Sequence, residues 1–310
     1  MKNVLITAIG SFSADTAIKT CRDKLGWRVI GCDIYPMEWI AQSMEVDVFY
    51  QAPRASEADK YMDFIIRLCE NEQIDYILPS TDVEIDVLSP RRKELPEGTT
   101  LCISGMKTIE ICRDKKAFAD RVRCSIPTDY LKNVPEASYP VIVKPVNGRS
   151  SQGLKRIYTA EEYALARNDD EGDLIVQPML EGDIVTVDVV RHPKSHYVEV
   201  LPRVELLRTL AGAGTSVKIC RDSYLEDLCK EIAEDLRIIG CVCFEFIKDS
   251  DGGYHIMECN PRLSGGVAFS VTAGYDFVKA HFDCFCADDI DVKPDIEEMY
   301  IARKYNEYIM

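Results

Sequence analysis

The 310-residue sequence has no apolar run that approaches the roughly 20 residues needed to span a bilayer. Its N-terminal segment contains only a short apolar stretch, whereas a signal peptide needs a longer apolar run and a small-residue cleavage site. We therefore interpret this segment as a buried strand. We expect a cytoplasmic protein that has no membrane partner.

The sequence is also poor in positive charge. Its 37 lysines and arginines are outnumbered by 52 aspartates and glutamates, which gives a net charge of −15. Nucleic-acid binding depends on a basic surface, because phosphate contacts supply much of the affinity. We therefore expect no nucleic-acid partner, and we interpret the excess acid as a solvated surface that favours solubility.

Histidine is scarce, and the cysteine pairs lack the spacing of a zinc site. The four histidines do not lie in a recognisable serine or cysteine triad motif. The pairs Cys241/Cys243 and Cys284/Cys286 are C-x-C, whereas zinc sites normally have about two to four intervening residues. We expect the 13 cysteines to be reduced, with Cys241 and Cys243 packed as small apolar side chains on one face of a strand.

The first third of the sequence alternates short apolar strands with helical patterns. Strands are expected at 4–8, 28–32 and 76–78, and helices at 13–25 and 60–71. Short buried strands separated by helices predict a parallel, doubly wound α/β sheet. This unit ends near residues 98–105, and the pattern changes from about Ile111.

The remaining sequence is richer in strands. They are expected at 141–145, 174–177, 184–190, 241–247 and 254–257, and a helical stripe runs from Leu225 to Leu236. Asp251-Gly252-Gly253 predicts a turn that pairs the last two strands as a hairpin. The length of the chain predicts two or three domains.

The most informative motif is Glu258-Cys259-Asn260-Pro261-Arg262, at the end of the last of these strands. Residues two apart on a strand point to the same side, so Glu258 and Asn260 present two oxygen ligands in one direction. Mg²⁺ prefers oxygen ligands and shares them with substrate phosphates. Arg262 adds a planar cation suited to phosphate or carboxylate. The alternative is a strand end with solvated polar residues.

Glu245 strengthens the metal interpretation. It is a single acid among apolar residues, and a buried carboxylate is costly unless it is paired or bound to a metal. In the hairpin, Glu245 and Glu258 could lie opposite each other, where like charges repel. A divalent cation between them would remove that repulsion, so we expect a metal at this position.

Two lysines and a loop suggest phosphate binding. Lys144 ends an apolar strand, where a buried lysine needs an anion. The loop at 147–153 is rich in glycine and serine, whose backbone N–H groups can close over phosphates, although the spacing of a Walker A loop is absent. Lys115, next to Asp114 and Lys116, is by itself more typical of a solvated helix face.

The segment at 174–183 is a candidate for adenine recognition. An apolar strand leads into an extended stretch with a glycine, whose N–H and C=O groups can recognise an adenine edge. Gln177 could add a side-chain acceptor, and Asp183 could reach ribose hydroxyls. The alternative is a strand, a loop and a second strand.

Together and in this order, these motifs resemble the ATP-grasp superfamily, especially its branch similar to the carbamoyl-phosphate synthase large subunit and to stand-alone carboxylate–amine ligases. The resemblance implies a Rossmann-like pre-ATP-grasp α/β domain followed by two α+β subdomains that clamp ATP. We place these units at residues 1–110, at 111–182 (the nucleotide lid) and at 183–310 (the metal and substrate site).

The resemblance also implies the site residues. Those for ATP are Lys115, Lys144, Gly148, Ser150, Ser151, Gly153, Gln177, Met179, Leu180 and Asp183. Those for two Mg²⁺ ions, or Mn²⁺ in their place, are Glu245, Glu258 and Asn260. Those for the acyl phosphate are Arg262 and the backbone of Ser264, Gly265 and Gly266. Arg203, with Arg208 behind it, is our candidate for a second cation at the substrate or γ-phosphate; the alternative for each is a surface-loop arginine.

The sequence departs from the family pattern at three places. Pro178 stands where many relatives have an acid or a lysine, and because it has no N–H we expect the Gln177 C=O and the Leu180 N–H to contact adenine. Asp183 could be displaced by one residue in the match. Relatives have a larger C-terminal domain beyond the position of Arg303, and we expect it to be missing or much reduced here.

The activity implied by the resemblance is that of an ATP-dependent carboxylate–amine or carboxylate–thiol ligase, which makes an acyl phosphate of an amino acid or another small carboxylate. Bicarbonate is the activated acid in some variants of the class, and a homodimer is implied by resemblance only.

Two other functions stay open at this point. One is a non-catalytic nucleotide sensor on the same fold, although the intact metal ligands count against it. The other is an NAD-binding oxidoreductase, because Asp33 follows Gly10 at a spacing that suits a ribose contact. The segment after Gly10 lacks the other glycines of G-x-G-x-x-G, so we interpret it as an ordinary βα turn.

Overall fold

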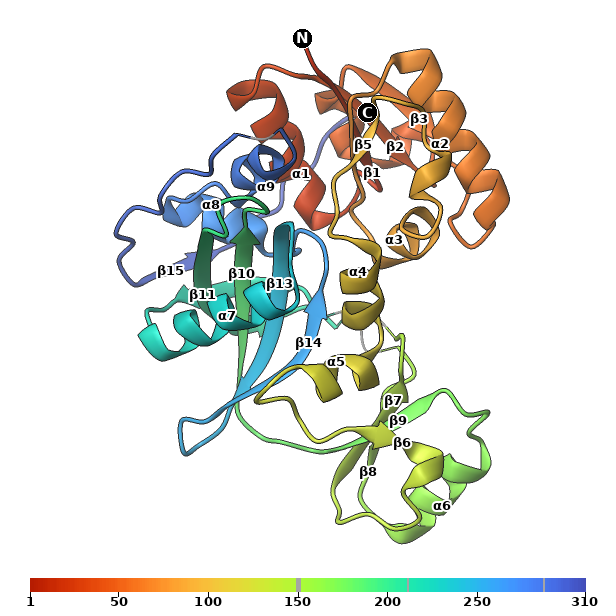
Figure 1. The fold of residues 1–310 in the computed structure, drawn as a ribbon, viewed down its shortest axis with the longest axis vertical. Helices are drawn as coiled ribbons and strands as arrows, with labels where there is room; N and C mark the ends of the chain where they lie inside the picture. Colours follow the sequence, from red (N-terminus) through yellow and green to blue (C-terminus); the bar gives the residue numbers. More distant parts are fainter. Residues whose placement is uncertain (149–151, 211, 287) are drawn as a thin grey trace.

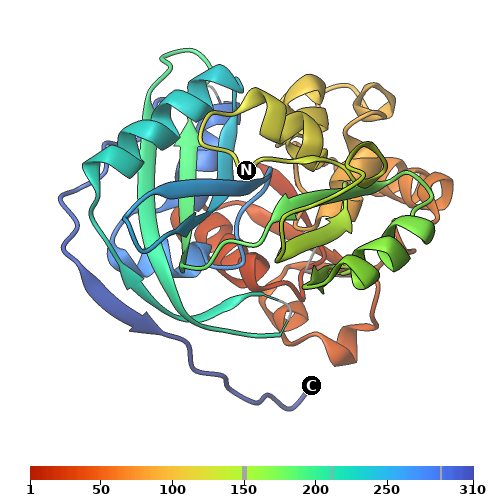
Figure 2. The same cartoon turned by 90° about the horizontal axis from the view of Figure 1, so that it is seen from below.

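The computed structural model describes residues 1–148, 152–210, 212–286 and 288–310. Its strands form three sheets. Figure 1 shows the smallest of them at the lower end of the molecule, away from the N-terminal sheet, and Figure 2 views the molecule from that end. Among the described residues, no helix has the length and apolar character that a membrane crossing requires.

The N-terminal sheet is parallel and doubly wound, as the sequence predicts. Its order is β3-β2-β1-β4-β5. The strands are β1 (Asn3–Thr7), β2 (Arg28–Asp33), β3 (Val48–Gln51), β4 (Tyr76–Leu78) and β5 (Thr100–Leu101), and the helices are α1 (Phe12–Lys19), α2 (Ala58–Glu72), α3 (Asp82–Leu88) and α4 (Met106–Arg113). The strand order reverses between β1 and β4, so the loops after these two strands meet at one edge of the sheet.

The smallest sheet is antiparallel, with the order β6-β9-β7-β8. It consists of β6 (Asp129–Tyr130), β7 (Val141–Pro145), β8 (Lys155–Ile157) and β9 (Leu174–Pro178), and helix α6 (Ala160–Asn168) covers it. Pro178 still belongs to β9, opposite Val141. A proline is tolerated at the end of a strand, because it has no N–H and the ladder there lacks only one hydrogen bond.

The largest sheet is antiparallel, with the order β14-β13-β10-β11-β12-β15. Its strands are β10 (Asp183–Arg191), β11 (Val198–Arg208), β12 (Gly214–Ile219), β13 (Gly240–Lys248), β14 (Tyr254–Asn260) and β15 (Met299–Ala302). Helix α7 (Ser223–Asp235) packs on one face. Helices α8 (Val267–Ala273) and α9 (Phe277–Cys286) lie between the other face and the N-terminal sheet, in a core that both share (Figure 1).

Helix α5 (Lys115–Arg121) begins at Asp114, whose carboxylate accepts the N–H groups of Lys116 and Ala117 at 2.8 Å each. Phe118 and Cys112 pack into the core between α7 and the largest sheet. The stretch that joins the N-terminal sheet to the smallest sheet is therefore anchored on the largest one. The domain bounds 1–110, 111–182 and 183–310 stay a prediction.

His281 ties α9 to both of its neighbours. It is buried, its Nδ1 accepts the Cys241 N–H of β13 at 2.8 Å, and its Nε2 donates to the Cys102 carbonyl, just after β5, at 3.1 Å. The contact with Cys241 requires the neutral imidazole, because Nδ1 can accept only when it carries no proton. Burial lowers the pKa of His281 from 6.5 to about 4, against the opposing effect of the Cys102 carbonyl.

This depressed pKa predicts a pH-dependent stability. Between about pH 6.5 and 4 the unfolded chain binds a proton that the folded chain does not, so stability falls as the pH drops through that window. We expect a loss of about 2 kcal/mol between about pH 7 and 5 from this residue. Urea unfolding of the wild type and of His281→Gln at both pH values measures this contribution. The other titrating groups affect both proteins equally, so the difference in pH dependence comes from His281. The same pH dependence in both would contradict the assignment.

Candidate active site

A cavity of about 880 Å³ lies where the three sheets meet. The predicted residues that line it are Lys115, Lys144, Gly148, Gln177, Met179, Leu180, Arg203, Arg208, Glu245, Glu258, Asn260, Arg262, Ser264, Gly265 and Gly266. Gly153 and Asp183 are described but do not line the cavity, and Ser150 and Ser151 lie outside the described residues. The cavity thus gathers most of the residues that the sequence singled out.

The β13–β14 hairpin carries the carboxylates. Glu245 lies directly opposite Glu258, and Cys243 lies opposite Asn260, so all four residues face the same side of the sheet. The predicted opposition of the two acids is therefore present. Burial and the charge of Glu258 raise the pKa of Glu245, as two carboxylates sharing a site would.

Counter-charges surround this pair. Glu245 Oε1 accepts from Asn260 Nδ2 at 3.1 Å, and its Oε2 accepts from Arg208 Nη2 at 3.2 Å. Lys115 Nζ lies 3.4 Å from Glu258 Oε2 and donates to the Gly148 carbonyl at 2.6 Å. Lys115 is only 6% exposed, so the solvated helix face considered from sequence is wrong for this lysine.

Lys144 reaches the cavity from β7. Burial lowers its pKa; Lys115 lowers it further, whereas the charges of Glu258 and Glu245 oppose the shift. Within the part of the chain that the structure describes, Lys144 has no carboxylate within ion-pair distance. A half-buried ammonium facing a cavity is well placed to meet an anionic ligand.

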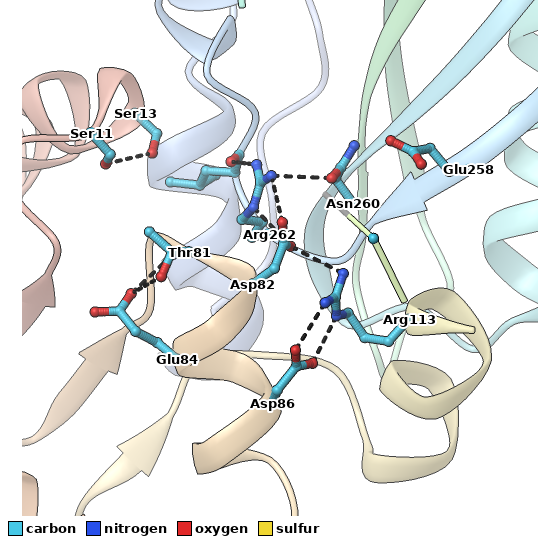
Figure 3. A network of polar contacts seen from close by, with 12 residues as sticks. Ser11, Ser13, Thr81, Asp82, Glu84, Asp86, Arg113, Glu258, Asn260 and Arg262 are labelled. Atoms are coloured by element: carbon cyan, nitrogen blue, oxygen red, sulfur yellow. Dashed lines mark hydrogen bonds and ion pairs between the residues drawn. The ribbon is translucent and has the colours of Figure 1, made fainter. Parts of the chain in front are cut away.

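Arg262 makes a contact that the sequence did not predict. Its Nε and Nη2 donate to the two oxygens of Asp82, each at 3.0 Å, as Figure 3 shows. Asp82 is the first residue of α3, in the N-terminal domain. Burial would raise the pKa of Asp82, but Arg262, Arg113 and Lys115 together hold it below its ordinary value. The partner could not be found from sequence because 180 residues separate the pair.

Arg203 lies within β11, opposite Thr186, and is 1% exposed. Its Nη1 donates to Asp188 Oδ2 at 2.7 Å, and its Nη2 donates to Ser264 Oγ at 3.0 Å. A surface-loop arginine is therefore wrong for this residue. Arg208, at the end of β11, is exposed and donates to the Gly212 carbonyl at 2.7 Å.

The β9 end of the cavity holds the residues predicted to contact adenine. Gln177 is buried, and its Nε2 donates to Thr128 Oγ1 at 2.6 Å, a partner that the sequence did not suggest. The Met179 N–H donates to the Pro140 carbonyl at 3.0 Å. The Met179 N–H therefore already has a partner, which is consistent with Leu180 as the predicted N–H donor to adenine.

The turn after β1 does not resemble a dinucleotide site. Asp33 Oδ2 accepts the Gly10 N–H at 3.0 Å, and its Oδ1 accepts the Tyr35 N–H at 3.1 Å. Ile40 covers Gly10 so closely that a Cβ at Gly10 would lie 3.0 Å from Ile40 Cδ1. Both oxygens of Asp33 thus accept backbone N–H groups of neighbouring loops. This favours the ordinary βα turn over an NAD site.

Comparison with known families covers most of the chain. Residues 4–103 match the family described as PylC-like, N-terminal domain. Residues 170–307 match the family described as ATP-grasp in the biosynthetic pathway with Ter operon. These two segments contain the N-terminal sheet and the largest sheet, respectively.

Solved structures share the whole arrangement. The biotin carboxylase domain dimer of Hydrogenobacter thermophilus 2-oxoglutarate carboxylase, in complex with MgADP, ADP and bicarbonate, superposes with a TM-score of 0.79 at 19% identity, covering 96% of this chain and 73% of that one. Staphylococcus aureus N5-carboxyaminoimidazole synthetase with ADP gives 0.73 at 14%, covering 94% and 78%. Bacillus licheniformis L-amino acid ligase gives 0.68 at 15%, covering 90% and 72%.

Two of these structures contain ADP, and the third is named a ligase, the class of enzyme that the sequence predicted. The N-terminal family match, the C-terminal family match and the shared fold agree with the order of motifs along the chain. Residues 170–307 thus match an ATP-grasp family, and the chain as a whole shares its fold with these three solved structures.

Proposed function

We propose that this protein is an ATP-dependent ligase, which phosphorylates a carboxylate with Mg-ATP and joins the resulting acyl group to an amine. The observation that carries the proposal is the opposed pair Glu245–Glu258 on the cavity wall, with Asn260 beside it and Lys115 and Lys144 across from it. This arrangement suits a metal–nucleotide complex, because the carboxylates can bind its cation and the two lysines can bind its phosphates.

The residues present fit Mg²⁺. Two carboxylates and an amide oxygen are hard ligands, and two like charges directly opposite each other need a cation between them. Among the described residues no cluster of three or more histidine, cysteine or acidic side chains is arranged for a metal, so phosphate oxygens would complete the set. We propose two Mg²⁺ ions, replaceable by Mn²⁺, which when bound would neutralise charge on the β- and γ-phosphates.

The chain's own groups would position the reactants. Lys115 and Lys144 would hold the nucleotide phosphates, and the Gln177–Leu180 segment would hold the adenine. The substrate carboxylate would attack the γ-phosphorus in line while ADP leaves. Arg262 and the Ser264–Gly266 backbone would bind the acyl phosphate until the amine attacks its carbonyl carbon and phosphate leaves. Positioning and electrostatics supply most of the rate of phosphoryl transfer.

The proposed substrate class is based on the chemistry of the site and on the similar solved structures. An L-amino acid ligase and a bicarbonate-bound carboxylase domain are among the similar structures, so an amino acid or another small carboxylate is our first candidate, and bicarbonate is the second. An amine is the proposed acceptor, with a thiol as the alternative. One of the similar structures is a dimer, which supports a homodimer as part of the proposal.

Nucleotide choice tests the proposal first. We expect Mg-ATP to bind in a calorimetric titration and NAD not to bind. Lys144→Met should weaken ATP binding at least about tenfold, since a charge-assisted contact to phosphate is lost. Lys155→Met, which removes an exposed lysine from the neighbouring strand β8, is the matched control and should bind as the wild type does. Tight NAD binding with no ATP signal would refute the proposal.

Glu258→Gln tests the metal. The change removes the charge but keeps the shape, and we expect carboxylate-dependent phosphate release to fall at least about a hundredfold. Stability without nucleotide should change by less than about 1 kcal/mol, because relief of the repulsion from Glu245 offsets the lost pair with Lys115. Asp251→Asn, in the exposed turn of the same hairpin, controls for charge and should leave turnover unchanged. Near wild-type turnover in Glu258→Gln would remove this residue from the mechanism and favour a nucleotide sensor.

Gly265 and Gly266, which follow Ser264, supply a third test. A Cβ at Gly266 would lie 2.5 Å from Arg203 Nη2, whereas one at Gly265 would meet nothing nearer than Phe12 Cβ at 3.8 Å. Gly266→Ala should therefore displace the Arg203 guanidinium, lower stability by about 1–3 kcal/mol and depress turnover. Gly265→Ala should melt within about 0.5 kcal/mol of the wild type. Thermal melting and phosphate release of both variants decide the matter, and equal behaviour of the two would contradict the packing described here.

A further inference from the structure

A two-point polar contact, the fork between Asp82 and Arg262, joins the N-terminal domain to the rest of the site. Both hydrogen bonds measure 3.0 Å, and Asp82 is only 3% exposed (Figure 3). Such a two-point contact fixes the plane of a guanidinium as well as its position. The acid thus determines which way Arg262 faces.

The remaining donors of Arg262 are also mostly used. An arginine side chain has five N–H donors. Nη2 donates to Asn260 Oδ1 at 3.1 Å in addition to Asp82, and Nη1 donates to the Leu263 carbonyl at 3.2 Å. One N–H of Nη1 is left for a ligand among the described contacts. Arg262 therefore meets a ligand through a single donor, whose direction follows from the fork.

The same arginine orients a proposed metal ligand. Asn260 Oδ1 accepts from Arg262, and Asn260 Nδ2 donates to Glu245 Oε1 at 3.1 Å. A continuous chain of contacts thus runs from Asp82 through Arg262 and Asn260 to the carboxylate pair. Removal of the first member would loosen each of the others.

Asp82 is itself held firmly by its own domain. It begins α3 immediately after the N-cap Thr81, whose N–H and hydroxyl donate to the buried Glu84 at 3.0 and 2.7 Å. Tyr61, from α2, donates to the other Glu84 oxygen at 3.1 Å. The start of α3 is therefore fixed by the N-terminal core.

We propose that Asp82 is a positioning residue of the phosphoryl-transfer site, which keeps Arg262, and through it Asn260, turned toward the substrate rather than onto the metal-binding carboxylates. This inference rests on the proposed function. Arg262 is permanently charged and contacts Asn260, whose amide group in turn contacts Glu245. Without Asp82 it would turn toward Glu245 and Glu258 and compete there with the metal.

Asp82→Asn tests the inference, because asparagine keeps the shape but loses the charge. We expect kcat for phosphate release to fall about a hundredfold and KM for Mg-ATP to rise about tenfold, because the displaced arginine competes with the metal. Glu94→Gln is the matched control. It breaks another carboxylate–arginine fork of the N-terminal domain, Glu94 to Arg91 at 2.9 and 2.8 Å, and should leave kcat within about twofold.

Two further measurements separate positioning from general stability. In the double variant Asp82→Asn/Arg262→Gln, kcat should be no lower than in Arg262→Gln alone, since Asp82 acts through the arginine. Binding of Mn²⁺ with ATP, followed by electron paramagnetic resonance, should weaken about tenfold in Asp82→Asn and stay unchanged in Glu94→Gln. Losses that multiply in the double variant, or equal Mn²⁺ binding in Asp82→Asn and the wild type, would overturn the inference.

Failure of the proposed function looks different. A wild type that releases no phosphate with any carboxylate would refute the ligase proposal, whereas Mn²⁺ binding would still decide the role of Asp82. A folded Asp82→Asn with wild-type kcat would overturn only the positioning role.

Discussion

The rest of this site depends on two carboxylates that lie directly opposite each other on β13 and β14. Glu245 and Glu258 face one cavity, and their mutual repulsion is unfavourable unless positive charge is close by. The structure supplies that charge through Arg208 and Lys115, and it supplies an amide hydrogen through Asn260. A metal–nucleotide complex would take over the same task, and this links the electrostatics of the hairpin to the proposed chemistry.

The site depends on all three sheets. The largest sheet carries the carboxylates and Arg203, the smallest carries Lys144, and the N-terminal domain contributes Asp82. Helices α8 and α9 fill the space between the N-terminal and largest sheets, and residues from both sheets share one apolar core. The N-terminal domain is therefore placed well enough for the Asp82 carboxylate to meet Arg262, which is fixed by the turn after β14.

Local patterns predicted the parts of the site that lie close together in sequence. The opposition of Glu245 and Glu258 followed from strand alternation and a short glycine turn, and the order of motifs predicted the ATP-grasp family that residues 170–307 match. The same reasoning missed Asp82, Thr128 and the buried setting of Arg203, because their partners lie on other elements. Strands β12 and β15 were also missed, because β12 has no regular alternation of buried residues and β15, whose residues do alternate, has only four.

Lys115 shows the limit of sequence reasoning most clearly. In the sequence, an acid and a second lysine flank it, a pattern typical of a solvated helix face. In the fold, α5 packs on the largest sheet and turns this side chain toward Gly148 and Glu258, whereas Lys116 pairs with Asp120 on the exposed side. The position of the helix, which no local pattern encodes, decides between the two roles.

The central claim is that a carboxylate oxygen attacks the γ-phosphorus of ATP. The most direct test supplies the carboxylate that stimulates phosphate release with oxygen-18 in its carboxyl group, together with Mg-ATP and the amine, and analyses the released phosphate by mass spectrometry. We expect one heavy oxygen per phosphate, because the attacking oxygen leaves with the phosphorus when the amine replaces it. Unlabelled phosphate, released in step with product, would contradict an acyl-phosphate intermediate.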